Sequence, residues 1–180
     1  MRVITGKARG VALKTPEGML TRPTADRVKE ALFSIIQFEI PGASVLDLFG
    51  GTGQLGIEAL SRGAKNATFV DSREESCRLI RENLKRTRLE QEAKVVRSDY
   101  LAYLERCGEQ YQIILLDPPY AEVFLENALK KITEIDILQS GGIIVAERPV
   151  GKDLPWEFPG YTRSKDYKYG KTLLTIYRKD

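Results

Sequence analysis

The sequence predicts an α/β protein with a doubly wound, mostly parallel sheet, an antiparallel hairpin at its C-terminal end, and a small hairpin and helix at its N-terminal end. From Ser44 onward, short apolar runs alternate with segments of helical periodicity, as in strands joined by crossover helices. The C-terminal stretch "YTRSKDYKYGKTLLTIYRK" instead reads as two strands that meet around Tyr169 to Lys171. At 180 residues, the chain is expected to form one domain, residues 1–180.

The N-terminal part has two pieces. Residues 1–22 are expected to form a basic appendage with a hairpin around Gly6 to Gly10, and their low apolar content places them outside the core. Residues 23–40 hold an expected helix that begins near Thr24 and packs on the sheet through one apolar face. That face comprises Val28, Ala31, Leu32, Ile35 and Ile36. Residues 41–180 then form the main body of the domain.

The main body is expected to contain five parallel strands, which with the two strands of the C-terminal hairpin make a seven-stranded sheet. The strands are expected near 44–48, 67–71, 94–98, 111–116 and 142–147, and the helices near 54–62, 73–88, 99–107 and 121–132. Ser72 with Glu75 three residues later predicts a capping box at the start of the second of these helices.

A glycine-rich loop follows the first of these strands in "VLDLFGGTGQLGIEAL". Gly51, Gly53 and Gly56 have the G-x-G-x-x-G spacing, and Asp71 lies at the end of the next strand, where it can accept both hydroxyls of a ribose. In a dinucleotide site such a loop holds a pyrophosphate. Asp47 stands at the mouth of this loop, and its charge would repel a pyrophosphate but suits the ammonium and sulfonium of S-adenosylmethionine.

A second motif, "LLDPPYAE", ends the buried strand "YQIILLD". Pro118 and Pro119 fix their backbone angles and remove two amide donors, which makes a rigid corner at the carboxyl end of the strand. Rigid loops at strand ends are where α/β proteins keep their sites, so Asp117 and Tyr120 become candidate functional residues.

Composition limits the chemistry. Histidine is absent, which removes histidine-based nucleophile activation and the commonest metal ligand, and no metal is expected. Cys77 and Cys107 have no metal-binding spacing, and no signal peptide or membrane-length apolar run is present. We therefore expect a cytoplasmic monomer.

Charge is distributed unevenly along the chain. Residues 1–22 carry five Lys and Arg against one Glu, residues 148–180 carry eight against four acids, and the middle carries fifteen against twenty. Basic ends around an acidic centre are either solvated surface or a split footprint for a polyanion.

With "GKARG", "TRPTADRVKEALFSII", "LDLFGGTG", "FVDS", "RSDY", "DPPY" and "YKYGKTLLTIY" in this order, nearly the whole chain resembles the Rossmann-like bacterial 16S rRNA guanine-N2 methyltransferases of the RsmD type. The resemblance implies S-adenosylmethionine as cofactor, held by Asp47, Gly51 and Gly53 at its methionine part, by Asp71 with Ser72 beside it at the ribose, and by Ser98 and Asp99 at the adenine.

The same resemblance gives the D-P-P-Y corner a reaction. The corner that Pro119 completes exposes the Pro118 carbonyl. Asp117 and this carbonyl would hold both hydrogens of an amino group out of the ring plane, so that the lone pair is withdrawn from the ring and returned to the nitrogen. Tyr120 would stack under the base. The expected partner is ribosomal RNA, either naked or in an assembling small ribosomal subunit, and the RNA-binding candidates are Arg2, Lys7, Arg9, Arg22, Lys168 and Lys171.

Two alternatives stay open at this point. Another amino-group methyltransferase, acting on adenine N6 or on a protein glutamine, would use the same corner, although the chain has no segment of a size to serve as a DNA target-recognition domain. A dinucleotide-dependent oxidoreductase would explain Gly51 to Gly56 but leaves D-P-P-Y without a role.

Overall fold

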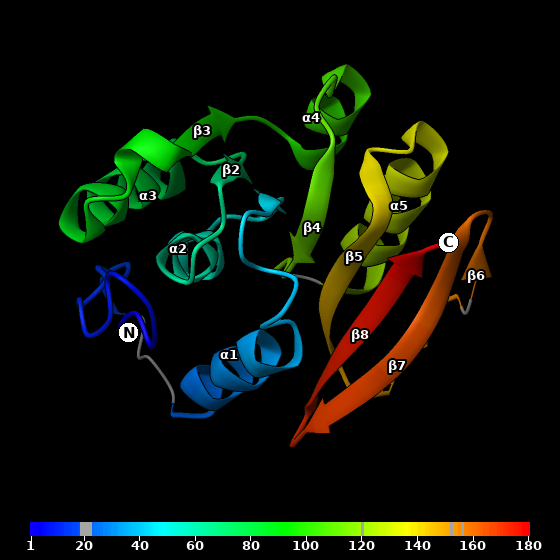
Figure 1. The fold of residues 1–180 in the computed structure, drawn as a ribbon, viewed down its shortest axis with the longest axis horizontal. Helices are drawn as coiled ribbons and strands as arrows, with labels where there is room; N and C mark the ends of the chain where they lie inside the picture. Colours follow the sequence, from blue (N-terminus) through cyan, green and yellow to red (C-terminus); the bar gives the residue numbers. More distant parts are fainter. Residues whose placement is uncertain (19–22, 120, 152, 156) are drawn as a thin grey trace.

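The computed structural model describes residues 1–18, 23–119, 121–151, 153–155 and 157–180. It is a three-layer arrangement in which one sheet separates two groups of helices (Figure 1). The helices and strands are α1 (Pro23–Ile35), β1 (Ser44–Asp47), α2 (Gln54–Ser61), β2 (Asn66–Asp71), α3 (Glu74–Thr87), a short 3₁₀ turn η1 (Glu90–Glu92), β3 (Ala93–Arg97), α4 (Tyr100–Arg106), β4 (Tyr111–Leu116), α5 (Ala121–Ile135), β5 (Leu138–Pro149), β6 (Glu157–Phe158), β7 (Tyr161–Tyr169) and β8 (Thr172–Lys179).

The sheet has the order β3-β2-β1-β4-β5-β8-β7-β6. The first five of these strands in the order are parallel, and β8, β7 and β6 join antiparallel. The predicted fold class is thus confirmed, with one difference: the two-residue strand β6 adds an eighth, edge strand that is too short to leave a periodic pattern. The order reverses between β1 and β4, and such reversal points are where α/β sheets bind ligands, outside the carboxyl ends of the strands.

Side chains alternate along the parallel strands between two cores. Val45, Leu115 and Val145 face the core that also contains side chains of α1, α2 and α3. Leu46 and Ile114 face the second core, which α4 and α5 cover. Both faces are therefore buried, which explains the uninterrupted apolar runs of these strands. On the predicted face of α1, Val28 and Leu32 are buried, as is Ile36 directly after the helix, whereas Ala31 and Ile35 are half-buried.

The N-terminal segment does not stay outside the core. Val3, Ala8 and Leu13 are buried in the α1–α3 core, so this expectation is wrong. The segment is held by polar side chains from helices distant in the sequence. The Glu58 carboxylate accepts hydrogen bonds from the amides of Ile4 (2.9 Å) and Thr5 (3.0 Å). Its hairpin is reduced to one antiparallel bridge, Arg2 to Ala12.

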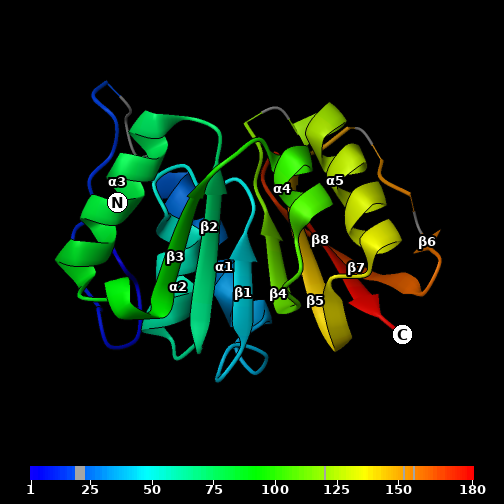
Figure 2. The same cartoon turned by 90° about the horizontal axis from the view of Figure 1, so that it is seen from above.

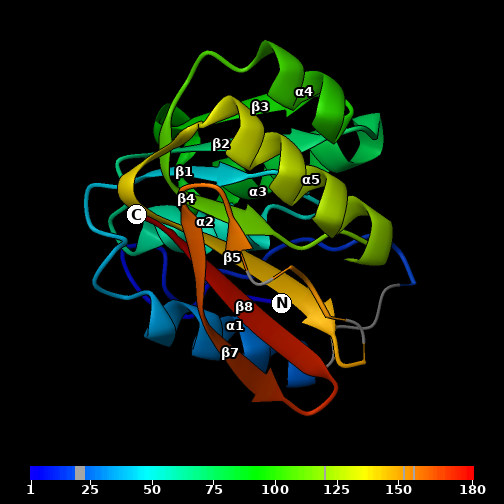
Figure 3. The same ribbon diagram turned by 90° about the vertical axis from the view of Figure 1, so that its right-hand side faces the viewer.

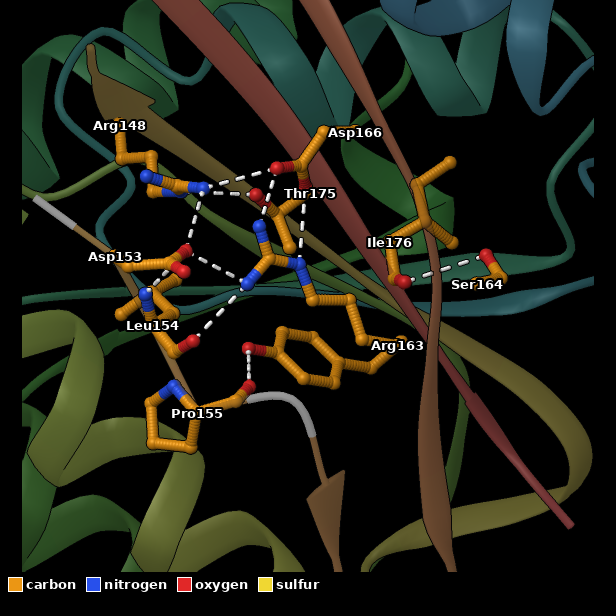
Figure 4. Close-up of polar contacts among 10 residues, drawn as sticks. Arg148, Asp153, Leu154, Pro155, Arg163, Ser164, Asp166, Thr175 and Ile176 are labelled. Atoms are coloured by element: carbon orange, nitrogen blue, oxygen red, sulfur yellow. Dashed lines mark hydrogen bonds and ion pairs between the residues drawn. The ribbon is translucent and has the colours of Figure 1, made fainter. Parts of the chain in front are cut away.

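Beyond the reversal point, the antiparallel strands run past α1 (Figure 3). Two buried arginines join them to the loop after β5. Arg148 on β5 lies 3.1 Å from Asp166 and 3.4 Å from Asp153, and Arg163 on β7 lies 2.8 Å from Asp153 and also pairs with Asp166 (Figure 4). This ion-pair network fixes the carboxyl end of β5 against β7 and β8.

Candidate active site

The parallel strands run in one direction and end at one edge of the sheet (Figure 2), and the motif residues lie at those strand ends. Asp47 is the last residue of β1, Asp71 the last of β2, and Asp117 follows the last residue of β4. Ser98 and Asp99 come between β3 and α4. Because parallel strands share their carboxyl edge, four separate motifs meet around the β1–β4 reversal point.

The glycine loop adopts the shape that its sequence predicts. Gly51 and Gly53 have φ of 58° and 82°, in the left-handed region that favours glycine. A Cβ on Gly51 would meet nothing nearer than the Phe49 carbonyl oxygen at 3.9 Å, so a ligand can approach the backbone there. Gly56 has a different reason to be glycine, since a Cβ on it would lie 2.3 Å from the Phe69 ring.

Asp47 carries the clearest sign of a missing partner. Its Oδ2 accepts a hydrogen bond from the Gly56 amide at 3.0 Å, but its Oδ1 is buried without a hydrogen-bond partner in the described part of the chain. Burial raises the pKa of this carboxyl to about 8. An orphaned acceptor beside an open glycine loop fits a ligand that carries an ammonium group, and it does not fit a pyrophosphate.

Asp71 ties the loop to the second strand. One carboxylate oxygen accepts the Gly51 amide at 3.0 Å and the other accepts the Arg73 amide at 2.9 Å. A carboxylate has about four acceptor positions, so two remain for a ligand. The capping box predicted at Ser72 and Glu75 is not formed, because Arg73 occupies the N-cap position of this helix. Ser72 is exposed and α3 begins after Arg73 without a side-chain cap.

Asp99 has a structural role in addition to its predicted one. Its Oδ1 caps α4 by accepting the amides of Leu101 (3.0 Å) and Ala102 (3.1 Å). Beside it is an aromatic group that the sequence reading missed: Tyr100 lies 5.1 Å from Phe49 and 5.4 Å from Phe124, between ring centroids. These rings offer an apolar wall next to Ser98 and Asp99.

At the D-P-P-Y corner, Pro118 is buried and Pro119 is exposed, whereas Tyr120 lies outside the described residues. Burial raises the pKa of Asp117 to about 6. A further acid, Glu147 on β5, lies beside it. Burial and the neighbouring Asp117 charge raise the pKa of Glu147 to about 8. Sequence reasoning missed Glu147, although an acid at the end of the next buried strand, "IIVAERP", was available as a signal.

The structure separates the predicted RNA-binding residues into two groups. Lys168 and Lys171 flank the β7–β8 turn. Because Thr172 pairs with Pro149 at the carboxyl end of β5, this turn lies at the same edge of the sheet as Asp117. Lys7 lies at the opposite edge: its amide donates to the Ser61 carbonyl at the end of α2, and its ammonium pairs with Glu92 just before β3. Arg9 belongs to the same turn.

Arg2 is exposed next to Met1, whose sulfur accepts a hydrogen bond from the Thr52 hydroxyl in the glycine loop. Arg22 lies outside the described residues. The sequence reading also missed two exposed arginines at the site edge: Arg97 is the last residue of β3, and Arg73 lies two residues after β2. In the described ranges, no group of three or more potential ligands is placed to hold a metal ion, and no helix is long and apolar enough to cross a membrane.

Comparison with known proteins shows which family the chain resembles. The family model described as "Conserved hypothetical protein 95" matches residues 1–178. A Bacillus subtilis protein named "Putative rRNA methyltransferase YlbH" is 40% identical over 99% of this chain and 99% of its own length. The Escherichia coli "Ribosomal RNA small subunit methyltransferase D" is 31% identical over 100% of this chain and 90% of its own.

A solved structure extends the likeness to the fold. That of an Escherichia coli protein, described as "Putative methyltransferase yhhF", superimposes with a TM-score of 0.90 at 29% identity and covers 100% of this chain and 98% of the other. The RsmD-type resemblance drawn from the motifs is thus confirmed, and because the family model spans nearly its whole length, the chain belongs to the family described as Conserved hypothetical protein 95.

Proposed function

We propose that this protein methylates the exocyclic N2 amino group of a guanine in small-subunit ribosomal RNA, with S-adenosylmethionine as methyl donor. The observation that carries the proposal is Asp117, a carboxylate held at the end of a buried strand by a di-proline corner, next to a glycine loop with an orphaned acid. The names of the relatives support the substrate class, since those proteins are described as rRNA methyltransferases.

The cofactor-binding residues follow from their places at the sheet edge. Asp47 would bind the ammonium of the methionine part, Gly51 and Gly53 would let the backbone approach it, and Asp71 with Ser72 would take the ribose. Ser98 and Asp99 would take the adenine, against the wall formed by Phe49 and Tyr100. The bound cofactor supplies a methyl group on a positively charged sulfonium, whose sulfur leaves as a neutral thioether when the methyl group is transferred.

Asp117 and Pro118 would prepare the nucleophile. The lone pair of an exocyclic amino group is delocalised into the ring, which makes the nitrogen a poor nucleophile. Two acceptors, the Asp117 carboxylate and the Pro118 carbonyl, would hold both amino hydrogens and keep the lone pair on nitrogen. The methylated nitrogen then sheds a proton readily, so no strong base is needed, which agrees with a chain that has no histidine.

The base must leave its stack to reach this corner, at a cost of a few kcal/mol. Tyr120 would recover part of that cost by stacking, and phosphate contacts would recover more. Lys168 and Lys171 are on the site edge, whereas Lys7 and Arg9 would contact RNA that wraps round the domain. We infer a cytoplasmic location, because ribosomal RNA is processed there.

Mass spectrometry of ribosomal RNA nucleosides tests this function. Cells without the gene are expected to lose N2-methylguanosine at one position of 16S rRNA, and the purified protein to restore it when given S-adenosylmethionine. Parallel reactions on naked 16S rRNA and on small subunits from those cells would identify the natural substrate. Loss of N6-methyladenine instead of N2-methylguanosine, or binding of NAD in place of S-adenosylmethionine, would contradict the proposal.

A further inference from the structure

Glu147 and Asp117 occupy equivalent positions on neighbouring parallel strands. Leu116 of β4 pairs with Ala146 of β5, so the next residue of each strand is an acid. Alternation along the strands turns both acids to the face of Leu115 and Val145. Asp47 on β1 belongs to that face too, but it pairs with Leu115 and so lies two positions before the level of Asp117. We call Asp47, Asp117 and Glu147 the carboxylate row.

The row lacks hydrogen-bond donors. Within the described part of the chain, no side chain or backbone amide donates to the carboxylate of Asp117 or of Glu147, and Asp47 has its orphaned Oδ1 although only 1% of the residue is exposed. The pKa values of all three are raised, chiefly by burial. The Asp47 Oδ1 is fully buried, and such an acceptor costs free energy unless a ligand supplies a donor. Asp117 and Glu147 are half-buried, so their carboxylates can be reached by a ligand from solvent.

The position of Glu147 in the row indicates which ligand that is. The strand order β1-β4-β5 places it two strands away from the glycine loop, or about 10 Å. The cofactor's ammonium belongs at Asp47, so Glu147 lies on the far side of the reacting amino group, towards the β7–β8 turn that carries Lys168 and Lys171. That is the side from which the base must enter.

We propose that Glu147 is a specificity-determining residue that accepts a hydrogen bond from N1–H of the target guanine while Asp117 and the Pro118 carbonyl hold its N2 amino group. This inference rests on the proposed function. Guanine presents two adjacent donors on its Watson–Crick edge, N1–H and N2–H₂, which match two adjacent carboxylates. Adenine has an unprotonated N1 that would face the ionised Glu147 carboxylate as a second acceptor, and the site in that state would reject it.

Changing the target base, rather than only the protein, distinguishes a role of Glu147 in base recognition from a role in keeping the protein folded. 2,6-Diaminopurine keeps the N2 amino group of guanine but has no hydrogen on N1. We would join 16S rRNA by ligation from a transcript and a synthetic oligonucleotide, with guanosine or 2,6-diaminopurine at the mapped position, and use it naked or reconstituted into small subunits. Transfer of labelled methyl groups at pH 8.5, above the raised pKa of Glu147 but where guanine still holds its N1 proton, gives kcat/KM for each base.

The wild-type protein is expected to prefer guanosine over 2,6-diaminopurine by about 10²-fold or more, since its ionised acceptor would be left facing another acceptor. Glu147→Ala is expected to lower kcat/KM on guanosine and to reduce this preference to within about threefold. Glu147→Gln, which keeps an acceptor oxygen and the side-chain length, is expected to retain part of the preference. Calorimetry is expected to show unchanged S-adenosylmethionine affinity in both variants.

The outcomes distinguish the two proposals. If the wild-type protein methylates guanosine and 2,6-diaminopurine equally, or if Glu147→Ala keeps the full preference, then Glu147 does not read N1 and the proposed function still stands. A large loss of S-adenosylmethionine affinity in Glu147→Ala would assign the residue to the cofactor and overturn the inference. Failure of the wild-type protein to methylate any guanosine overturns both proposals.

Discussion

Gly6 lies so close to Ser61 that a Cβ on Gly6 would be 1.8 Å from the Ser61 carbonyl oxygen. The contact docks the N-terminal segment on the end of α2, where the Lys7 amide donates to that same carbonyl at 2.9 Å. The Ser61 hydroxyl completes it by accepting the Ala8 amide at 3.0 Å. The last carbonyls of a helix have no partners within the helix, so the segment satisfies one of them.

Gly6→Ala is therefore expected to destabilise the protein by about 3 kcal/mol or more, because the backbone of α2 cannot yield and the segment must undock. Gly10→Ala is the matched control: Gly10 also has a positive φ, but its Cβ would meet no atom within 4 Å. It is expected to cost only about 1–2 kcal/mol, the backbone strain alone. Urea denaturation measures both, and equal losses in the two variants would contradict the docking contact.

The ion-pair network of Arg148, Arg163, Asp153 and Asp166 gives a second stability prediction. Asp166 contacts both buried guanidinium groups, so Asp166→Ala is expected to cost about 3–5 kcal/mol, the scale for breaking a buried pair. Asp153→Ala is expected to cost less, because the Asp153 side chain is 65% exposed. A larger loss for Asp153→Ala than for Asp166→Ala in urea denaturation would refute this order.

The same network predicts sensitivity to acid. Burial acts to raise the pKa of Asp166, but the hydrogen bond from Arg163 and the arginine charges outweigh it and hold the pKa below its ordinary value. The stabilisation from Asp166 is thus complete above the ordinary pKa of an aspartate and is lost as the pH falls through the lowered value. Wild-type stability is expected to fall towards that of Asp166→Ala below about pH 4.

Asp117→Ala tests the amino-orienting role. Turnover is expected to fall by about 10² or more, because one preorganised acceptor at the reacting nitrogen is lost, while S-adenosylmethionine affinity stays nearly the same. Asp117→Asn keeps one acceptor oxygen, so its turnover is expected to lie between those of the wild-type protein and Asp117→Ala. Single-turnover methyl transfer measures the rates and calorimetry the affinity. Near-normal turnover in Asp117→Ala would remove Asp117 from the mechanism.

What the sequence could predict was set by local pattern. The parallel strands were predictable because both of their faces are buried, and Asp47, Asp71 and Asp117 could be assigned to one edge because each follows an apolar run. The docking of the first residues was not predictable. Its contacts are backbone amides meeting Glu58 and Ser61 more than 50 positions away, and such contacts leave no periodic signal.

The site shows the same division. The capping box at Ser72 was a valid local pattern, but α3 begins one residue later, with Arg73 at its N-cap and no side-chain cap, and the pattern alone does not fix a helix end to one residue. Glu147 belongs to no motif. Its place beside Asp117 depends on β5 pairing with β4 in one register, which the sequence alone does not fix.

Asp47 yields the last prediction, in which stability and binding move in opposite directions. A carboxyl whose pKa is raised to about 8 in the folded protein holds its proton more tightly there than in the unfolded chain, so it lowers stability as the pH rises from about 4 to 8. Asp47→Asn is expected to match the wild-type melting temperature near pH 4 and to exceed it by a growing margin up to pH 8. The ammonium of S-adenosylmethionine favours the ionised carboxylate, so binding to the wild-type protein releases a proton below pH 8. Its affinity is expected to rise by up to about tenfold per pH unit between pH 6 and 8. Asp47→Asn is expected to bind more weakly and without that rise. Calorimetry in two buffers of different ionisation enthalpy detects the released proton, and its absence in the wild-type protein would show that Asp47 does not meet the ammonium group.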